Sequence, residues 1–90
     1  MAGEPFKIEE DEQFLEEVRR EFGSERVWDD IRRLIELDMA KAPHEFPMFP
    51  NTRFHFAALV TKPQRILIFE VDGINQVIFY RGVRRSGGDN

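Results

Sequence analysis

Arginine dominates the chemistry that the last third of this 90-residue sequence offers. From Arg53 the chain reads RFHFAALVTKPQRILIFEVDGINQVIFYRGVRR, a series of apolar strand-like runs with arginines near their ends. Arginine keeps its charge in proteins, and its planar guanidinium matches the geometry of phosphate oxygens. Several arginines on one small sheet therefore indicate an anion site, with phosphate as the first ligand to consider.

Three strands joined by short turns would place these arginines on one sheet. The apolar runs predict strands over residues 53–60, 64–71 and 76–83. The Asp-Gly pair between the last two is typical of a tight hairpin turn. The middle strand is apolar on both faces, so we expect helices on one face of the sheet and a groove or a partner on the other.

Helices account for most of the first half of the chain. A short strand is predicted over residues 6–8, followed by a helix from about residue 10 to Gly23 and a second helix from Ser24 to about Lys41. Gly is a natural helix end and Ser a natural N-cap, so the two helices should form a hairpin. The predicted fold class is α+β, with a short N-terminal strand, a helical hairpin and a three-stranded antiparallel meander.

Size and composition narrow the choice of function. The chain is expected to form a single domain over residues 1–90, with disordered tails at 1–4 and 86–90. It has no Cys, which excludes disulfides and Cys-ligated metals and favours the cytoplasm over secretion. No apolar run approaches the roughly 18–20 residues of a membrane span. The two His residues are not spaced as metal ligands, so we expect no metal. We also expect no cofactor and no association with a membrane.

The net charge of −4 is unevenly distributed. Residues 1–50 carry 14 acidic and 7 basic side chains, whereas residues 51–90 carry 3 acidic and 6 basic ones. The acidic total argues against nonspecific coating of nucleic acid, but the split allows a basic face on the sheet. Helices that collect solubilising Glu and Asp explain the same split without any binding site.

The order of elements, together with the segment PQRILIFEVDGINQVIFYRGVRR, resembles the RelE/ParE toxin superfamily of toxin–antitoxin modules. In that family an Arg opens a hydrophobic strand ending in Val, as Arg65 does before ILIFEV, and basic residues follow the last strand. The resemblance implies cleavage of mRNA, usually on the ribosome, in the RelE branch, or inhibition of DNA gyrase in the ParE branch. It also implies a cognate antitoxin as the protein partner, with RNA or the ribosome as further partners.

A metal-independent endoribonuclease needs cations that stabilise the charged phosphorane, a base and an acid. The resemblance assigns the first cation to Arg65 and the second to Arg84 or Arg85, of which we take Arg85 as catalytic. Histidine is a common acid–base residue in proteins, and tyrosine could donate a proton or stack on a base, so His55 and Tyr80 join the predicted catalytic set. The predicted phosphate contacts are Arg53, Lys62, Arg81 and Arg84.

Each predicted site residue also has a purely structural interpretation. Arg65 could pair with Glu70 or a helix carboxylate, His55 could form a hydrogen bond on its strand, and Tyr80 could belong to the core. RelE-type enzymes usually carry a catalytic Tyr after the basic pair, whereas this sequence ends in SGGDN. One alternative is therefore a non-enzymatic protein-interaction module on the same fold, such as a phage or plasmid protein that binds a host factor. A homodimer through the exposed face of the sheet is another.

Overall fold

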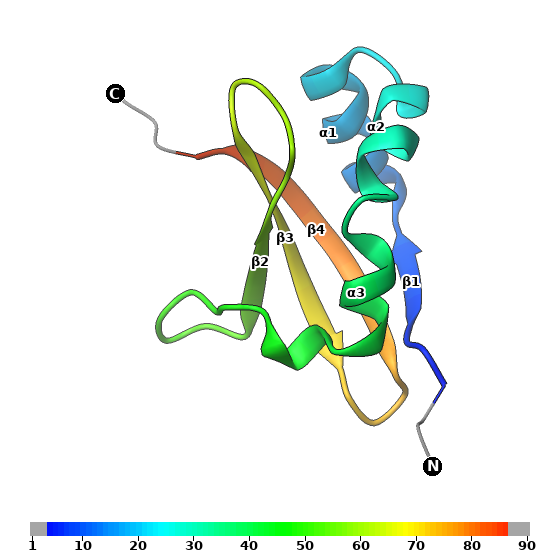
Figure 1. The fold of residues 1–90 in the computed structure, drawn as a ribbon, viewed down its shortest axis with the longest axis vertical. Helices are drawn as coiled ribbons and strands as arrows, with labels where there is room; N and C mark the ends of the chain where they lie inside the picture. Colours follow the sequence, from blue (N-terminus) through cyan, green and yellow to red (C-terminus); the bar gives the residue numbers. More distant parts are fainter. Residues whose placement is uncertain (1–3, 87–90) are drawn as a thin grey trace.

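The computed structural model describes residues 4–86, which form a four-stranded sheet with helices along one side (Figure 1). The elements are β1 (Lys7–Glu10), α1 (Glu12–Phe22), α2 (Glu25–Arg32), α3 (Glu36–Lys41), a 3-10 helix η1 (Pro43–Glu45), β2 (Phe54–Ala58), β3 (Arg65–Asp72) and β4 (Val77–Arg85). The predicted α+β class is confirmed. The predicted tails lie mostly outside the described residues, although the backbone N–H of Ser86 donates to Gln64 O at 3.0 Å.

The sheet is mixed, which corrects the expectation of a purely antiparallel sheet. Strands β2, β3 and β4 form the predicted antiparallel meander, in the strand order β1-β4-β3-β2. Strand β1 lies beside β4 and runs parallel to it, with Ile8 opposite Ile78. The helices and the β2–β3 hairpin lie between β1 and β4 in the sequence, and they bring β4 beside β1 with the same chain direction. The four residues of β1 alone do not predict this parallel pairing.

The junction between α1 and α2 follows local sequence signals. The Asp11 carboxylate caps α1 by accepting a hydrogen bond from Phe14 N at 2.8 Å. Gly23 ends α1 with φ 86°, in the left-handed region that favours glycine. Ser24 then caps α2 by accepting from Val27 N at 3.3 Å. The predicted helix end at Gly23 and the predicted N-cap at Ser24 are both confirmed.

The second predicted helix is interrupted, so the helical hairpin contains a third helix. Residues 33–35 form a turn in which the N–H groups of Leu34 and Ile35 donate to carbonyls three residues earlier. The turn contains neither Gly nor Pro, so nothing in the local sequence marks it. Contacts of Arg32 flank the break: at the end of α2 it binds Glu36, the first residue of α3, and also Glu10 of β1.

The core lies between the helices and one face of the sheet, which we call the inner face. Its buried apolar side chains are Phe14, Val18, Trp28, Met39, Ala57, Leu59, Leu67, Phe69, Ile78, Tyr80 and Val83. The opposite outer face also carries large apolar side chains, all partly exposed: Phe54, Phe56, Ile66, Ile68 and Phe79. The sheet therefore has the second, partly apolar face that the composition of its middle strand predicted.

A β-bulge in β4 decides which arginine lies on which face. Ile68 pairs with Gly82 but Phe69 pairs with Tyr80, so Arg81 is an extra residue in the ladder. After the bulge the alternation of β4 is reversed. Arg85 consequently lies opposite Arg65 on the inner face, whereas Arg84 lies opposite Ile66 on the outer face.

Candidate functional site

The predicted catalytic cations Arg65 and Arg85 meet on the inner face, but a carboxylate lies between them. Their Nε atoms lie 2.7 and 2.9 Å from the same Oε2 atom of Glu21 on α1. The Arg65 side chain is only 10% exposed and lies over the Phe22 ring. Hydrogen bonds from Arg65 and then Arg85 hold the pKa of the Glu21 carboxyl below its usual range, although burial acts in the opposite direction. The two arginines are therefore bound to the protein's own anion.

Glu70, the other carboxylate considered for Arg65, lies elsewhere. Five residues separate the two along β3, so their side chains point to opposite faces of the sheet. The partner of Arg65 is a helix carboxylate, which the sequence allowed without identifying it.

Arg84 is held in a similar way at the edge of β4. Strand β1 pairs only with the first half of β4. Glu17 of α1 reaches the edge beyond it and accepts a hydrogen bond from Val83 N at 2.8 Å and another from the Arg84 guanidinium. Glu17 and Glu21 lie one helical turn apart, so α1 presents two neighbouring carboxylates to the arginines at this end of the sheet.

His55 is buried and lies far from the predicted catalytic arginines. Its Nδ1 is 2.8 Å from the carbonyl oxygen of Phe46, which accepts the hydrogen bond, and its ring stacks on Phe69. His55 pairs with Phe69, which is four residues along β3 from Arg65. At a rise of about 3.3 Å per residue this separation is about 13 Å. The structure therefore does not bring His55 into hydrogen-bond reach of Arg65.

Tyr80 is a core residue. Its side chain is 1% exposed and packs against Phe14 and Trp28. Burial, with the nearby Glu36 carboxylate second, raises the pKa of the phenol well above its ordinary value. The hydroxyl forms no hydrogen bond of ordinary geometry within the described residues, although Glu36 lies close to it. In this position the hydroxyl cannot contact an RNA base or a leaving group.

Three of the four predicted phosphate contacts gather on the outer face. The Glu70 carboxylate links two of them, with 2.7 Å between Oε2 and Arg53 Nε and 2.7 Å between Oε1 and Arg81 Nε. Arg84 follows on the same face beyond the bulge. Lys62 is exposed in the turn between β2 and β3. The cationic surface predicted from the sequence is thus on the outer face, separated from the buried groups predicted to be catalytic.

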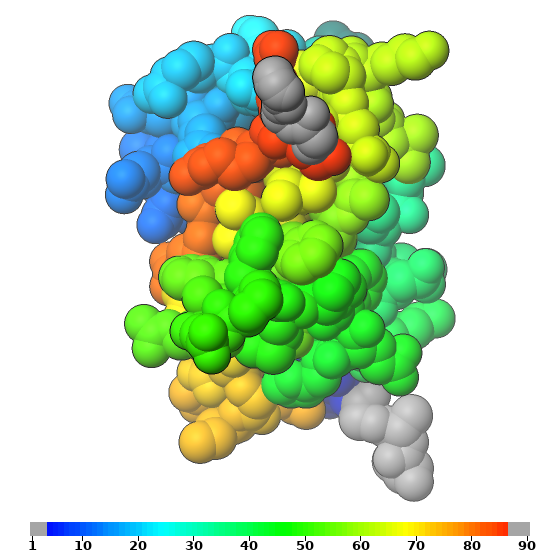
Figure 2. Space-filling view, turned by 90° about the vertical axis from the view of Figure 1, so that its left-hand side faces the viewer, coloured from blue at the N-terminus to red at the C-terminus, as the bar shows by residue number. Residues whose placement is uncertain are grey.

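A hollow of about 300 Å³ lies on this face, and we call it the outer-face hollow. It is lined by Phe49, Phe54, Ile68, Arg81, Gly82 and Arg84. Figure 2 shows the segment that precedes β2, in green, crossing this face below β4, in orange to red, with part of β3 visible in yellow between them. The lining combines an apolar floor with arginines, which suits binding of a side chain or small group more than it suits a reaction.

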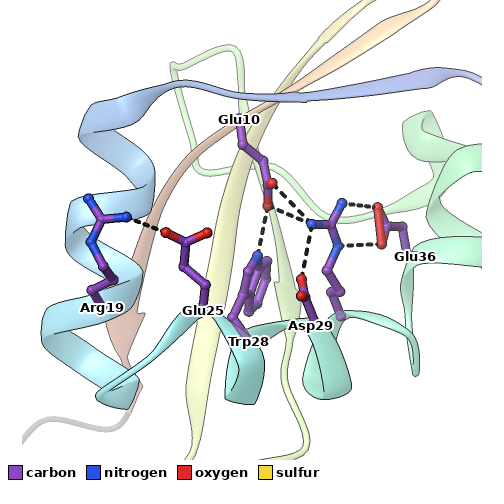
Figure 3. Close-up of polar contacts among 7 residues, drawn as sticks. Glu10, Arg19, Glu25, Trp28, Asp29 and Glu36 are labelled. Carbon is purple, nitrogen blue, oxygen red and sulfur yellow. Dashed lines mark hydrogen bonds and ion pairs between the residues drawn. The ribbon is translucent and has the colours of Figure 1, made fainter.

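A second polar cluster, which the sequence did not reveal, fastens β1 to the helices (Figure 3). Arg32 donates two hydrogen bonds of 2.6 Å to Glu36 and two of 3.0 Å to Glu10. Trp28 Nε1 donates to the same Glu10 carboxylate at 2.7 Å. The contact with Glu36, reinforced by Glu10, raises the pKa of Arg32 above its ordinary value against the effect of burial. Only the four-residue spacing of Arg32 and Glu36 hinted at this cluster, since the contact with β1 depends on the fold.

Comparison with known proteins leaves the function open. No protein-family model, no curated protein and no solved structure matches the chain. Across residues 4–86, no group of three or more His, Cys, Asp or Glu side chains is placed to hold a metal ion. Helices in the same region are too short and too polar to cross a membrane. The function must therefore be argued from the two faces of the sheet.

Proposed function

We propose that this chain is a non-enzymatic protein-interaction module that binds its partner through the outer face of the sheet. One observation supports this most strongly: large apolar side chains are partly exposed on a face that carries no helix, namely Phe54, Phe56, Ile66, Ile68 and Phe79. A strand that is apolar on both sides is normally covered on both sides. Contiguous apolar surface rimmed by charged residues is typical of protein-binding sites.

The inner face supports a structural role more than a catalytic one. For Arg65 and Arg85 to bind a phosphate there, Glu21 would first have to release both of them. The pKa of Glu21 is lowered, so protonation near neutral pH does not release them. His55 and Tyr80 are buried as well, so acid–base chemistry would require part of the core to open.

A toxin-like action on RNA, or on a nucleic-acid enzyme such as gyrase, is the second candidate and retains the RelE/ParE resemblance as a hypothesis. The gathering of Arg53, Arg81 and Arg84 beside Phe54 favours it, because single-stranded RNA binds where cations accompany exposed aromatic rings. Its partner would be a cognate antitoxin. It predicts that expression slows growth and that Arg65→Ala relieves this effect, and normal growth would rule it out. Cleavage of RNA by the purified chain would favour action on RNA over action on gyrase.

Photo-crosslinking in the native host tests the first proposal. A benzophenone amino acid replaces Phe54 in the outer-face hollow, and in the matched control it replaces Ile74, which is 94% exposed in the β3–β4 turn. We expect the probe at Phe54 to form one discrete protein adduct that the probe at Ile74 does not form. An RNA adduct would support the second candidate instead. Equal, diffuse labelling from both positions would overturn the interaction proposal.

A further inference from the structure

Gly82, the residue of β4 that follows the bulge, lines the outer-face hollow, and the Arg84 guanidinium and the Glu17 carboxylate lie over it. Gly82 lies opposite Ile68, and a Cβ atom at Gly82 would come within 2.9 Å of Nη1 of Arg84. The hollow of about 300 Å³ is at the small end of ligand pockets, which span about 300–1,000 Å³. Its size therefore suits one large apolar side chain better than a cofactor.

The arginines at the hollow have hydrogen-bond donors to spare. The side chains of Arg81 and Arg84 are 40% and 58% exposed. A guanidinium has five N–H donors, and the contacts within residues 4–86 leave Nη2 of both arginines without a partner. Carboxylates on a partner can therefore bind here without displacing Glu70 or Glu17.

We propose that the outer-face hollow receives one large apolar side chain, such as Phe or Leu, from an acidic segment of a partner protein. Carboxylates that flank this side chain bind the open edges of Arg81 and Arg84, and Arg53 adds a third cation beside them. This inference rests on the proposed protein-interaction function and specifies the chemistry of the partner.

A second copy of the chain and single-stranded RNA fit the hollow less well. Face-to-face pairing of two copies would bring like-charged arginines together. RNA requires several open rings for stacking, but Phe49 packs on Phe56 at 4.7 Å between ring centroids, and the Arg81 guanidinium lies 5.0 Å from the Phe79 ring centroid. Two aromatic side chains, Phe49 and Phe54, line the hollow, and Phe49 is already packed on Phe56.

An NMR titration of the uniformly ¹⁵N-labelled chain tests the inference with two synthetic peptides of equal length. One carries a central Phe flanked by Glu, and the other a central Phe flanked by Lys. The Glu peptide is expected to shift the amide resonances of Ile68, Gly82 and Arg84, and to bind at least about tenfold more tightly than the Lys peptide. Oligouridylate and a dilution series of the chain alone are measured alongside.

Three variants locate the binding site within the titration. Gly82→Val adds a branched side chain to the lining of the hollow and pushes the Arg84 guanidinium aside, so it is expected to weaken the Glu peptide by about tenfold or more. Arg84→Gln, on an exposed side chain, is expected to weaken it about two- to fivefold and serves if Gly82→Val does not fold. The matched control Arg26→Gln removes an exposed charge from α2 and is expected to change nothing.

Several outcomes would overturn the inference. The two peptides could bind equally, cause no shifts at millimolar concentration, or shift only residues on other surfaces. Oligouridylate could bind more tightly at the same amides. The chain alone could show concentration-dependent shifts that mark a dimer through this face. If the probe at Phe54 still forms its discrete protein adduct in the native host, these outcomes refute the acidic segment alone. If that adduct is missing too, the proposed function falls with it.

Discussion

Replacing Glu21 by Gln is the perturbation that tests whether the inner-face arginines are structural. Gln has nearly the same shape and can still accept a hydrogen bond from Arg65 Nε, but it removes the negative charge shared by Arg65 and Arg85. Removing one partner of a fully buried ion pair costs about 3–5 kcal/mol. Arg65 and Glu21 are 10% and 23% exposed, and the amide oxygen remains, so we expect Glu21→Gln to lower the free energy of unfolding by about 2 kcal/mol. Arg85 is largely exposed and adds little.

The size of this effect should depend on pH. The folded state lowers the pKa of Glu21, so its contribution is complete above its ordinary value of about 4.5 and is lost as pH falls through the lowered folded value. The difference in stability between the natural chain and Glu21→Gln should therefore stay constant from about pH 8 to 5.5 and shrink below about pH 4.5.

Thermal unfolding followed by circular dichroism measures both effects. A loss of about 2 kcal/mol corresponds to a Tm lowered by about 10 °C in a domain of this size. Glu16→Gln is the matched control, because Glu16 lies on the same helix with an exposed side chain. Equal Tm values for Glu21→Gln and Glu16→Gln at pH 7 would refute the structural reading of Arg65.

Three further substitutions test other parts of the structure by urea unfolding. Gly23→Ala places a side chain at φ 86° and should lower the free energy of unfolding by about 1 kcal/mol. Gly73→Ala, at an ordinary φ, should leave it unchanged, and equal losses for the two variants would contradict the left-handed cap. Tyr80→Phe removes a buried hydroxyl that has no partner in the described chain, so stability should stay the same or rise by up to about 1 kcal/mol, and a clear loss would reveal a missed hydrogen bond. Glu10→Gln should lower the free energy of unfolding by about 2 kcal/mol and alter Trp28 fluorescence, whereas Glu9→Gln, at an exposed neighbour, should do neither. If Glu10→Gln leaves the stability unchanged, the cluster of Figure 3 is not stabilising.

The features that the sequence predicted are those with local causes. Gly23 and Ser24 end one helix and start the next because a left-handed residue and a side-chain cap act within a single turn. The meander of β2, β3 and β4 follows from apolar alternation. The predicted tight Asp-Gly turn was wrong in detail, because Asp72 pairs with Val77 across a four-residue loop whose positive φ lies at Gln76 and not at Gly73. The Asp72 carboxylate stabilises this loop by accepting hydrogen bonds from Ile74 N and Asn75 N at 3.1 Å. The break at residues 33–35 was missed because the turn contains neither Gly nor Pro, and the contact of Arg32 with Glu10 of β1 beside it forms only in the fold.

The predicted site separated into two parts for a similar reason. His55 and Arg65 both lie on the inner face, but the sequence could not show that the β2–β3 register keeps them about 13 Å apart. Alternation also could not choose between Arg84 and Arg85, because the bulge at Arg81 reverses the order of faces. With many carboxylates on the helices, nothing in the sequence singled out Glu21 as the partner of Arg65.

Hydroxyl-radical footprinting in the native host, compared with the purified chain, measures directly whether the outer face is an interface. Phe54 and Phe79 report on the outer face, while Leu37 and Ile74 report on exposed surface elsewhere. We predict that Phe54 and Phe79 are oxidised in the purified chain and protected in the cell, with Leu37 and Ile74 oxidised equally in both. Oxidation of Phe54 and Phe79 to the same extent in the cell and in the purified chain would contradict the proposal that a partner covers this face.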